Sequence, residues 1–179
     1  MDLENTLRTL APGLVRFCIG ILGHADEGED LAQESLAALV RFWKSNGPPD
    51  SPAAFVYLVA RRQAGRFRRR WKRFLPLPSL DAQADCAVNP ERGAIESQRI
   101  SQALGLLNRL PRRQRQALLI ALDNDIRVTD AARALGISVS AFKMRVCRAR
   151  RCLRQWLEEN HEKEGTRGDR PGNGARNGR

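Results

Sequence analysis

The chain has 179 residues, and its 31 Lys and Arg outnumber its 20 Asp and Glu, which gives a formal net charge of +11. So basic a balance is unusual for a soluble enzyme that acts on small molecules, and it favours a polyanionic partner. A membrane partner would call for a long apolar span, whereas Arg16 and Gly20 interrupt the longest apolar stretches. Nucleic acid is therefore the expected partner.

The first residues and the cysteines both predict a cytoplasmic protein. Residues 1–5 lack the basic start and the apolar run of a secretory signal. The cysteines form no Cys-x-x-Cys pair, which argues against a redox or metal motif. Free thiols are therefore expected at Cys18, Cys86, Cys147 and Cys152.

Apolar residues recur at helical spacing along almost the whole chain, which predicts an all-α fold. A first helix is expected over 3–10 and a second after Pro12, ending at Gly23. The next helix is expected from Asp26 to the turn at 46–49, and its first turns are acidic. Carboxylates suit a helix N-terminus, but the excess beyond one or two could also be a docking surface for a basic partner protein. The acidic residues are Asp26, Glu27, Glu29, Asp30 and Glu34.

Ser51 and Pro52 predict the start of a third, long helix, because Ser can cap a free backbone N–H and Pro suits the first helical position. This helix begins with apolar residues and continues into the basic run 61–73. Close like charges on one helix repel each other, and contact with a phosphate backbone would relieve that repulsion. The arginines that we predict to bind DNA here are Arg61, Arg62, Arg66, Arg69 and Arg70.

Prolines break the helical pattern over 75–90, which predicts a flexible linker between two small helical domains. The first domain is expected over 1–74 and the second over 91–160. Residues 161–179 are expected to form a disordered basic tail. The helices of the second domain are expected over 91–108, after Pro111, from Thr129 and over 139–157.

Residues 129–146 have the features of a helix-turn-helix. Thr129 and Ser138 are placed to cap its two helices, and Gly136 permits the positive φ that the turn needs. Apolar residues at steps of four and three, from Phe142 to Trp156, place one stripe of the second helix in the core. The free faces could enter a major groove. The residues that we predict to bind DNA there are Ser140, Lys143, Met144, Arg145, Arg148 and Arg151.

Over residues 5–158 these motifs resemble bacterial RNA polymerase sigma factors of the extracytoplasmic-function (ECF) type. Residues 26–43 are similar to the second conserved region of that family, and residues 110–153 are similar to the fourth. The resemblance implies that residues 55–61 and the arginine run recognise the minus-ten promoter element, and that the helix-turn-helix reads the minus-thirty-five element. It also implies that core polymerase is bound, on the clamp of its largest subunit, by Asp30, Gln33 and Glu34.

The chain departs from the family pattern in the arginine run. The family usually carries Asn directly after Ala-Arg and Asp four residues later, and these positions are Arg62 and Arg66 here. The side chains available for minus-ten readout are therefore changed. The partners implied by the resemblance are promoter DNA and core RNA polymerase, with an anti-sigma factor as a further partner and no small-molecule substrate.

Two other classes of protein are less favoured. A helix-turn-helix repressor or response-regulator output domain would explain residues 110–157 and predict dimers on palindromic sites, but it leaves the acidic cluster and the first basic helix unexplained. An enzyme is weaker still, because His24 and His161 are the only histidines and no phosphate loop, metal spacing or nucleophile elbow is present. We therefore expect no catalytic residue, no metal site and no cofactor.

Overall fold

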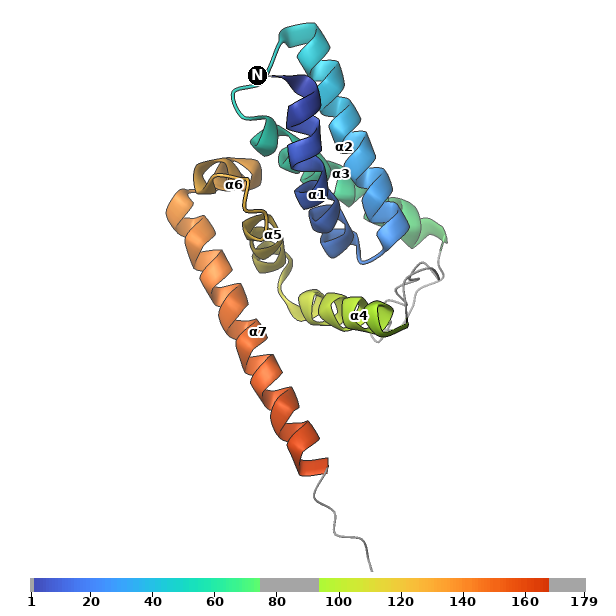
Figure 1. Cartoon of the computed structure of the whole chain (residues 1–179), viewed down its shortest axis with the longest axis vertical. Helices are drawn as coiled ribbons and strands as arrows, with labels where there is room; N and C mark the ends of the chain where they lie inside the picture. Colours follow the sequence, from blue (N-terminus) through green and yellow to red (C-terminus); the bar gives the residue numbers. More distant parts are fainter. Residues whose placement is uncertain (1, 75–93, 168–179) are drawn as a thin grey trace, which may run out of the picture.

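The computed structural model of the chain describes the backbone of residues 2–74 and 94–167 and the side chains of residues 2–66 and 101–158. These residues form seven helices and no strand, which confirms the all-α prediction. The first three helices lie together, α5 and α6 lie beside them, and the long α7 projects away from the rest (Figure 1). The helices are α1 (Leu3–Leu22), α2 (Ala25–Asn46), α3 (Pro52–Phe74), α4 (Ala94–Arg109), α5 (Arg112–Ala121), α6 (Val128–Leu135) and α7 (Val139–Arg167).

The prediction of two helices on either side of Pro12 is wrong, because α1 runs through this proline. A proline inside a helix lacks one backbone N–H and so removes one intrahelical hydrogen bond. Here Leu10 and Leu14 are buried on either side of the exposed Pro12. Burial of both turns against the neighbouring helices offsets the lost hydrogen bond and keeps the helix continuous.

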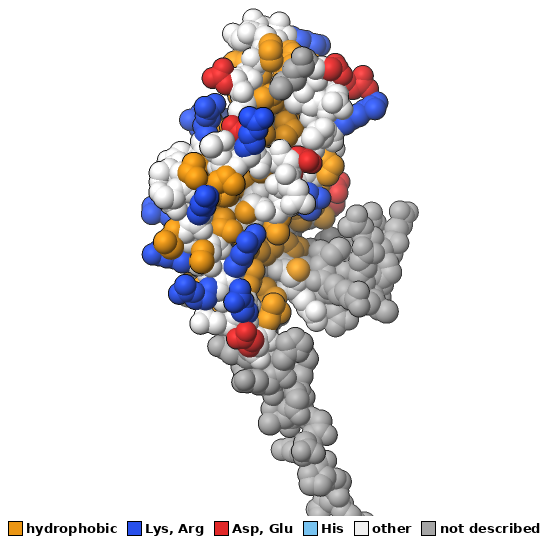
Figure 2. Space-filling view, turned by 60° about the vertical axis from the view of Figure 1, so that its left-hand side comes forward, with side chains coloured by type: hydrophobic (Ala, Val, Ile, Leu, Met, Phe, Trp, Pro, Cys, Tyr) orange, Lys and Arg blue, Asp and Glu red, His pale blue; other side chains and the backbone are white. Residues whose placement is uncertain are grey.

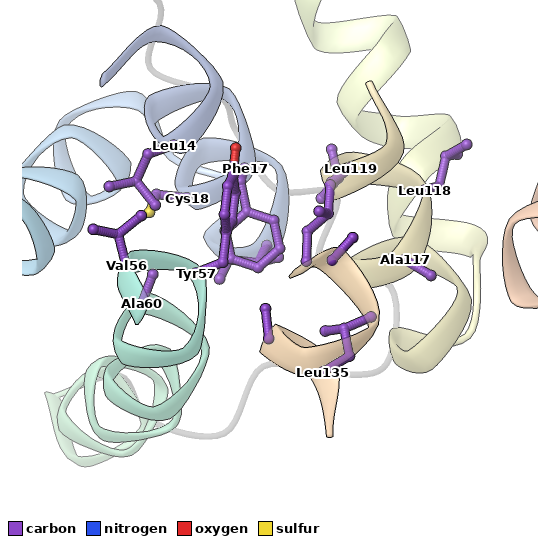
Figure 3. Packing of buried hydrophobic residues seen from close by; sticks show 14 of the residues in the cluster. Leu14, Phe17, Cys18, Val56, Tyr57, Ala60, Ala117, Leu118, Leu119 and Leu135 are labelled. Atoms are coloured by element: carbon purple, nitrogen blue, oxygen red, sulfur yellow. The ribbon is translucent and has the colours of Figure 1, made fainter. Parts of the chain in front are cut away.

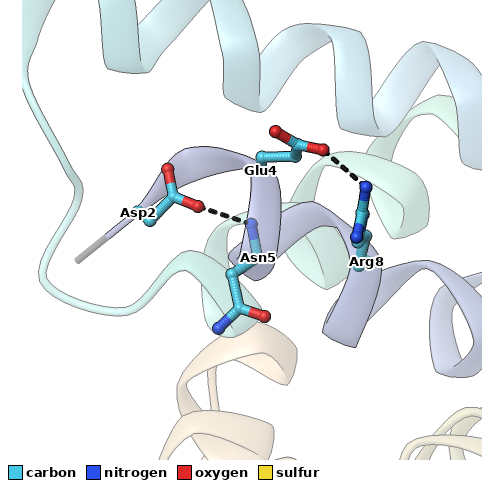
Figure 4. Close-up of polar contacts among 4 residues, drawn as sticks. All are labelled: Asp2, Glu4, Asn5 and Arg8. Carbon is cyan, nitrogen blue, oxygen red and sulfur yellow. Dashed lines mark hydrogen bonds and ion pairs between the residues drawn. The ribbon is translucent and has the colours of Figure 1, made fainter.

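Side-chain caps fix the starts of α1 and α3. The backbone N–H of Asn5 donates to the Asp2 carboxylate at 3.1 Å, and one turn further an exposed ion pair joins Arg8 to Glu4 (Figure 4). Ser51 acts on α3 as predicted, because its Oγ accepts from the backbone N–H of Ala54 at 3.1 Å. The cap contributes more than the ion pair, since an exposed pair of charges is screened by water.

The helix-turn-helix forms, but only two of its three predicted signals act as expected. Gly136 ends α6 with φ of 64°, and the Ser138 Oγ accepts from the backbone N–H of Ala141 at 3.2 Å. The prediction for Thr129 is wrong, because α6 begins at Val128 and Arg127 is its N-cap residue. The backbone N–H groups of Asp130 and Ala131 donate to the Arg127 carbonyl oxygen at 2.9 Å, so the helix starts two residues earlier without a side-chain cap.

The N-terminal half (α1–α3) and the C-terminal half (α5–α7) share one continuous cluster of buried residues. Figure 3 shows Phe17 and Tyr57, from α1 and α3, directed toward the α5 and α6 side chains. This packing brings into one core two halves that were expected to be joined by a linker alone. The predicted linker at 75–90 lies outside the described residues, and the domain boundaries remain a prediction.

The end of α7 differs from the expectation. The helix runs on to Arg167, so it covers the first part of the 161–179 segment that was expected to be disordered. Glu162, Lys163 and Glu164 are good helix formers, which favours this continuation. The rest of the predicted tail lies outside the described residues. Within the described helices, none is long and apolar enough to cross a membrane.

Candidate nucleic-acid and polymerase interfaces

Helix α2 presents an acidic face to solvent. Asp30, Gln33 and Glu34 are all exposed, and their spacing places them on one side of the helix. The opposite side carries the buried Leu31 and Ser35, and the Ser35 hydroxyl donates to the Leu31 carbonyl oxygen at 2.7 Å. Burial of that side fixes the rotation of α2, so the structure brings the three predicted polymerase-binding residues together on a free surface.

The basic run of α3 begins at the contact with the C-terminal half. Arg62 and Arg66 are exposed, whereas Arg61 is partly buried and its Nε has no hydrogen-bond partner within the described residues. Burial lowers the pKa of the Arg61 guanidinium, and the charges of Arg62, Arg112 and Arg145 lower it further. The predicted Arg69 and Arg70 lie on α3, but their side chains fall outside the described residues.

Helix α7 turns one stripe inward and leaves its cationic residues outside. Phe142, Val146 and Ala149 are buried, as the spacing predicts. Lys143 and Arg148 are exposed, and so are Ser140, Met144 and Arg151. Arg145 differs from these five, because it is partly buried and its charge acts on Arg61 of α3.

A groove runs beside α7, with a volume of about 590 Å³. Its apolar lining includes Ile126, Val128 and Phe142, and Arg150 and Arg154 add positive charge. Val128 is 43% exposed, which is high for a large apolar residue. On this side of the molecule, Lys and Arg side chains lie among hydrophobic ones (Figure 2).

The sequence did not predict the hydrogen bond between the two halves. The Tyr57 hydroxyl of α3 donates to the Asp123 carboxylate at 2.5 Å, and both side chains are buried. Burial and this bond raise the Tyr57 pKa. The one signal in the sequence was a carboxylate directly after the apolar run 117–122, and no spacing rule connects it to residue 57. Arg112 was also missed as a neighbour of Arg61.

Two family models match the chain. Residues 6–74 match Sigma-70 region 2, and residues 100–153 match Sigma-70 region 4. The first match covers the acidic face and the whole basic run 61–73, and the second covers the helix-turn-helix.

Curated proteins include relatives of this chain. The chain is 28% identical over 152 residues to the ECF RNA polymerase sigma factor EcfG of Rhodopseudomonas palustris, covering 83% of this chain and 81% of that protein. It is 30% identical over 140 residues to the ECF RNA polymerase sigma factor ShbA of Streptomyces griseus, covering 73% of this chain and 72% of that protein.

Two solved structures share the fold. One is the sigma factor RpoE in complex with the anti-sigma factor NepR from Bartonella quintana, with a TM-score of 0.65, 24% identity and coverage of 88% of this chain and 97% of that one. The other is CnrH in complex with the cytosolic domain of CnrY, with a TM-score of 0.64, 16% identity and coverage of 88% of both chains. At these identities the likeness establishes the fold alone.

Proposed function

The chain belongs to the ECF family of RNA polymerase sigma factors, and from this premise we propose how its surfaces divide the work of promoter recognition. The acidic face of α2 binds core polymerase, the basic run of α3 binds the minus-ten element, and α7 binds the minus-thirty-five element. The observation that carries this proposal is the exposure of opposite charges on α2 and α7.

Asp30, Gln33 and Glu34 are suited to a protein partner rather than to DNA. Carboxylates repel phosphates, and an amide flanked by two carboxylates offers acceptors to Arg and Lys side chains. A basic surface on the polymerase clamp has the complementary charge. Because the three side chains are already exposed on a helix held by its buried side, docking needs little rearrangement of this surface.

The DNA-binding surfaces combine phosphate contacts with base contacts. Arg62 and Arg66 of α3 are exposed and can neutralise phosphates. On α7, Ser140 and Met144 lie in the N-terminal turns, where a recognition helix meets base edges, and Arg148 and Arg151 follow on the same side. Phosphate contacts would hold the register while the side chains nearest the N-terminus read the sequence.

This function requires no catalytic group of its own, because the polymerase supplies the chemistry. We place the protein in the cytoplasm, where a bacterial polymerase and its promoters are found. An anti-sigma factor is a further proposed partner, since both structural relatives were solved in complexes and RpoE is bound to one. The net charge of +11 fits a set of partners that includes DNA.

A footprint with and without core polymerase tests the proposal against the repressor alternative. We expect protection of two separate promoter segments only when the chain and core polymerase are present together. Size measurement of the free chain should give a monomer. A dimer that protects a palindromic site without polymerase would contradict the proposal and support the repressor.

A further inference from the structure

The C-terminal half fits closely against α1 at two glycines. A Cβ atom at Gly13 would lie 2.5 Å from Asp123 Cγ and 2.8 Å from the Tyr57 hydroxyl oxygen. At Gly20 it would lie 2.5 Å from Leu119 Cδ2. Gly13 is the more restrictive position, because the groups it faces are buried and bonded to each other, whereas the end of a Leu side chain can rotate. The close approach of the halves therefore depends on the missing side chain at Gly13.

A buried polar contact joins the halves at the same place. Asp123 is 5% exposed and Tyr57 is fully buried, and the hydrogen bond between them is 2.5 Å long. The backbone N–H of Asp125 donates to the second Asp123 carboxylate oxygen at 3.2 Å, and the Phe17 ring packs edge-on against Tyr57 with centroids 5.1 Å apart. When the halves separate, water can replace each partner, so the net contribution of such a bond is modest, about tenfold in an equilibrium constant.

Like charges oppose the same contact. Closing the halves brings Arg61 of α3 near Arg112 of α5 and Arg145 of α7, close enough for both to lower the Arg61 pKa. The Nε of Arg61 is buried there without a partner within the described residues. A partly buried guanidinium near other guanidiniums is unfavourable. Packing and the Tyr57–Asp123 hydrogen bond thus favour the closed form, and charge repulsion weakens it, as a reversible contact requires.

The closed form conflicts with binding two promoter elements at once. Arg61 and Arg145 lie close together, although they serve the minus-ten and minus-thirty-five elements in the proposed function. By their names these elements are about 25 base pairs apart, or about 85 Å at 3.4 Å per base pair. Tyr57, inside the 55–61 segment assigned to the minus-ten element, is also covered. The halves must therefore separate before both elements are bound.

We propose that Tyr57, Asp123 and Gly13 form a latch that holds the free protein in a self-masked closed form, and that promoter binding requires this latch to open. The proposal rests on the proposed function for the meaning of the masked surfaces. The closure itself rests only on the contacts between the halves. If only a fraction of the molecules is open, the apparent affinity for promoter DNA is reduced by that fraction.

Tyr57 is the one tyrosine of the chain, so it can report on the latch without other labels. The full chain is prepared with 3-fluorotyrosine, and its single fluorine resonance is recorded by NMR. We expect a buried environment for the unmodified chain. In Gly13→Ala the added Cβ would meet both the Asp123 carboxylate of the C-terminal half and the Tyr57 hydroxyl, so the two groups cannot keep their present positions beside α1. A fivefold to thirtyfold shift toward the open form is expected, about what one or two kcal/mol produces.

Two further variants make the result decisive. Gly105→Ala adds the same atom at a position with no neighbour within 4 Å, and its resonance should match that of the unmodified chain. Asp123→Ala removes the hydrogen-bond acceptor and should shift the resonance in the same direction as Gly13→Ala. If circular dichroism shows that Gly13→Ala has lost helix content, the Asp123→Ala spectrum alone tests the latch. Higher salt should return both variants toward the closed form, because it screens the arginine repulsion.

The latch is disproved if the unmodified chain already shows a solvent-exposed Tyr57, or if folded Gly13→Ala and Asp123→Ala both give the unmodified spectrum. These spectra need neither DNA nor polymerase. They can therefore disprove the latch while the footprint still supports the proposed function. Conversely, the variants could open as expected while the chain and core polymerase protect no promoter DNA. That result would support the latch and contradict the proposed function.

Discussion

Helices α2 and α7 are built on the same plan but offer opposite surfaces. Each buries one apolar stripe, with Leu31 and Leu39 on α2 and Phe142 and Ala149 on α7, and each leaves its charged residues outside. The charged residues exposed in the first turns of α2 are carboxylates, whereas most of the exposed charged residues of α7 are arginines. Burial therefore sets how each helix is oriented, and the exposed side chains decide whether protein or DNA is bound.

The largest expected contrast is between thiols of the two halves. Burial raises the pKa of Cys18 in the N-terminal core from 9.0 to about 12, whereas Cys147 on α7 is exposed. Three pKa units reduce the thiolate fraction about a thousandfold at neutral pH, and burial also blocks access. We expect iodoacetamide at pH 8 to modify Cys147 and leave Cys18 unmodified, as measured by peptide mass spectrometry. Equal labelling in the folded protein would show that the N-terminal core is open to solvent.

A charge reversal on the acidic face should have the next largest effect. Asp30→Arg places a cation on the face that we propose to contact a basic surface of the polymerase, and like charges facing each other cost several kcal/mol. The affinity for core polymerase, measured by fluorescence anisotropy, should fall about a hundredfold or more. Asp50→Arg, an exposed reversal in the turn before α3, is the matched control and should bind normally. Equal loss in both variants would point to net charge rather than to this face.

Removal of one cation from α7 should weaken DNA binding and leave polymerase binding unchanged. Arg148→Ala is expected to cost about 1–3 kcal/mol of promoter affinity if Arg148 contacts a base. The measurement is a filter-binding titration of the holoenzyme on promoter DNA. Arg8→Ala removes the same charge from the exposed surface of α1 and controls for the overall field. If Arg8→Ala and Arg148→Ala weaken binding alike, α7 is not the recognition helix.

The smallest contrast compares the two predicted caps of the helix-turn-helix. Ser138→Ala removes an N-cap hydrogen bond and should lower the free energy of unfolding by about 1 kcal/mol. Thr129→Ala removes an exposed side chain that caps nothing and should change it by less than about 0.5 kcal/mol. Urea unfolding followed by circular dichroism measures both. A larger loss for Thr129→Ala would restore the original assignment of the cap.

Local sequence signals predicted the helices and the exposed site residues, because periodicity and caps act within a few residues. Ser51, Gly136 and Ser138 act as predicted, and Asp30, Glu34 and Arg148 are exposed where the spacing placed them. Pro12 was misjudged because the packing that carries α1 through it comes from helices distant in the sequence.

The contact between the halves could not be predicted for the same reason. Residues 57 and 123 are 66 positions apart. Neither residue carries a local pattern that names the other, and a glycine such as Gly13 reads as an ordinary helix residue until a neighbouring carboxylate is placed beside it. Contacts of this kind depend on the whole fold.

In vitro transcription with purified bacterial core polymerase on a genomic DNA library tests the central claim most directly. The account predicts that adding the chain produces transcripts with defined start sites that core polymerase alone does not produce, and that Asp30→Arg abolishes them. If the chain binds core polymerase yet selects no start site on any template, or fails to bind it at all, the account is contradicted.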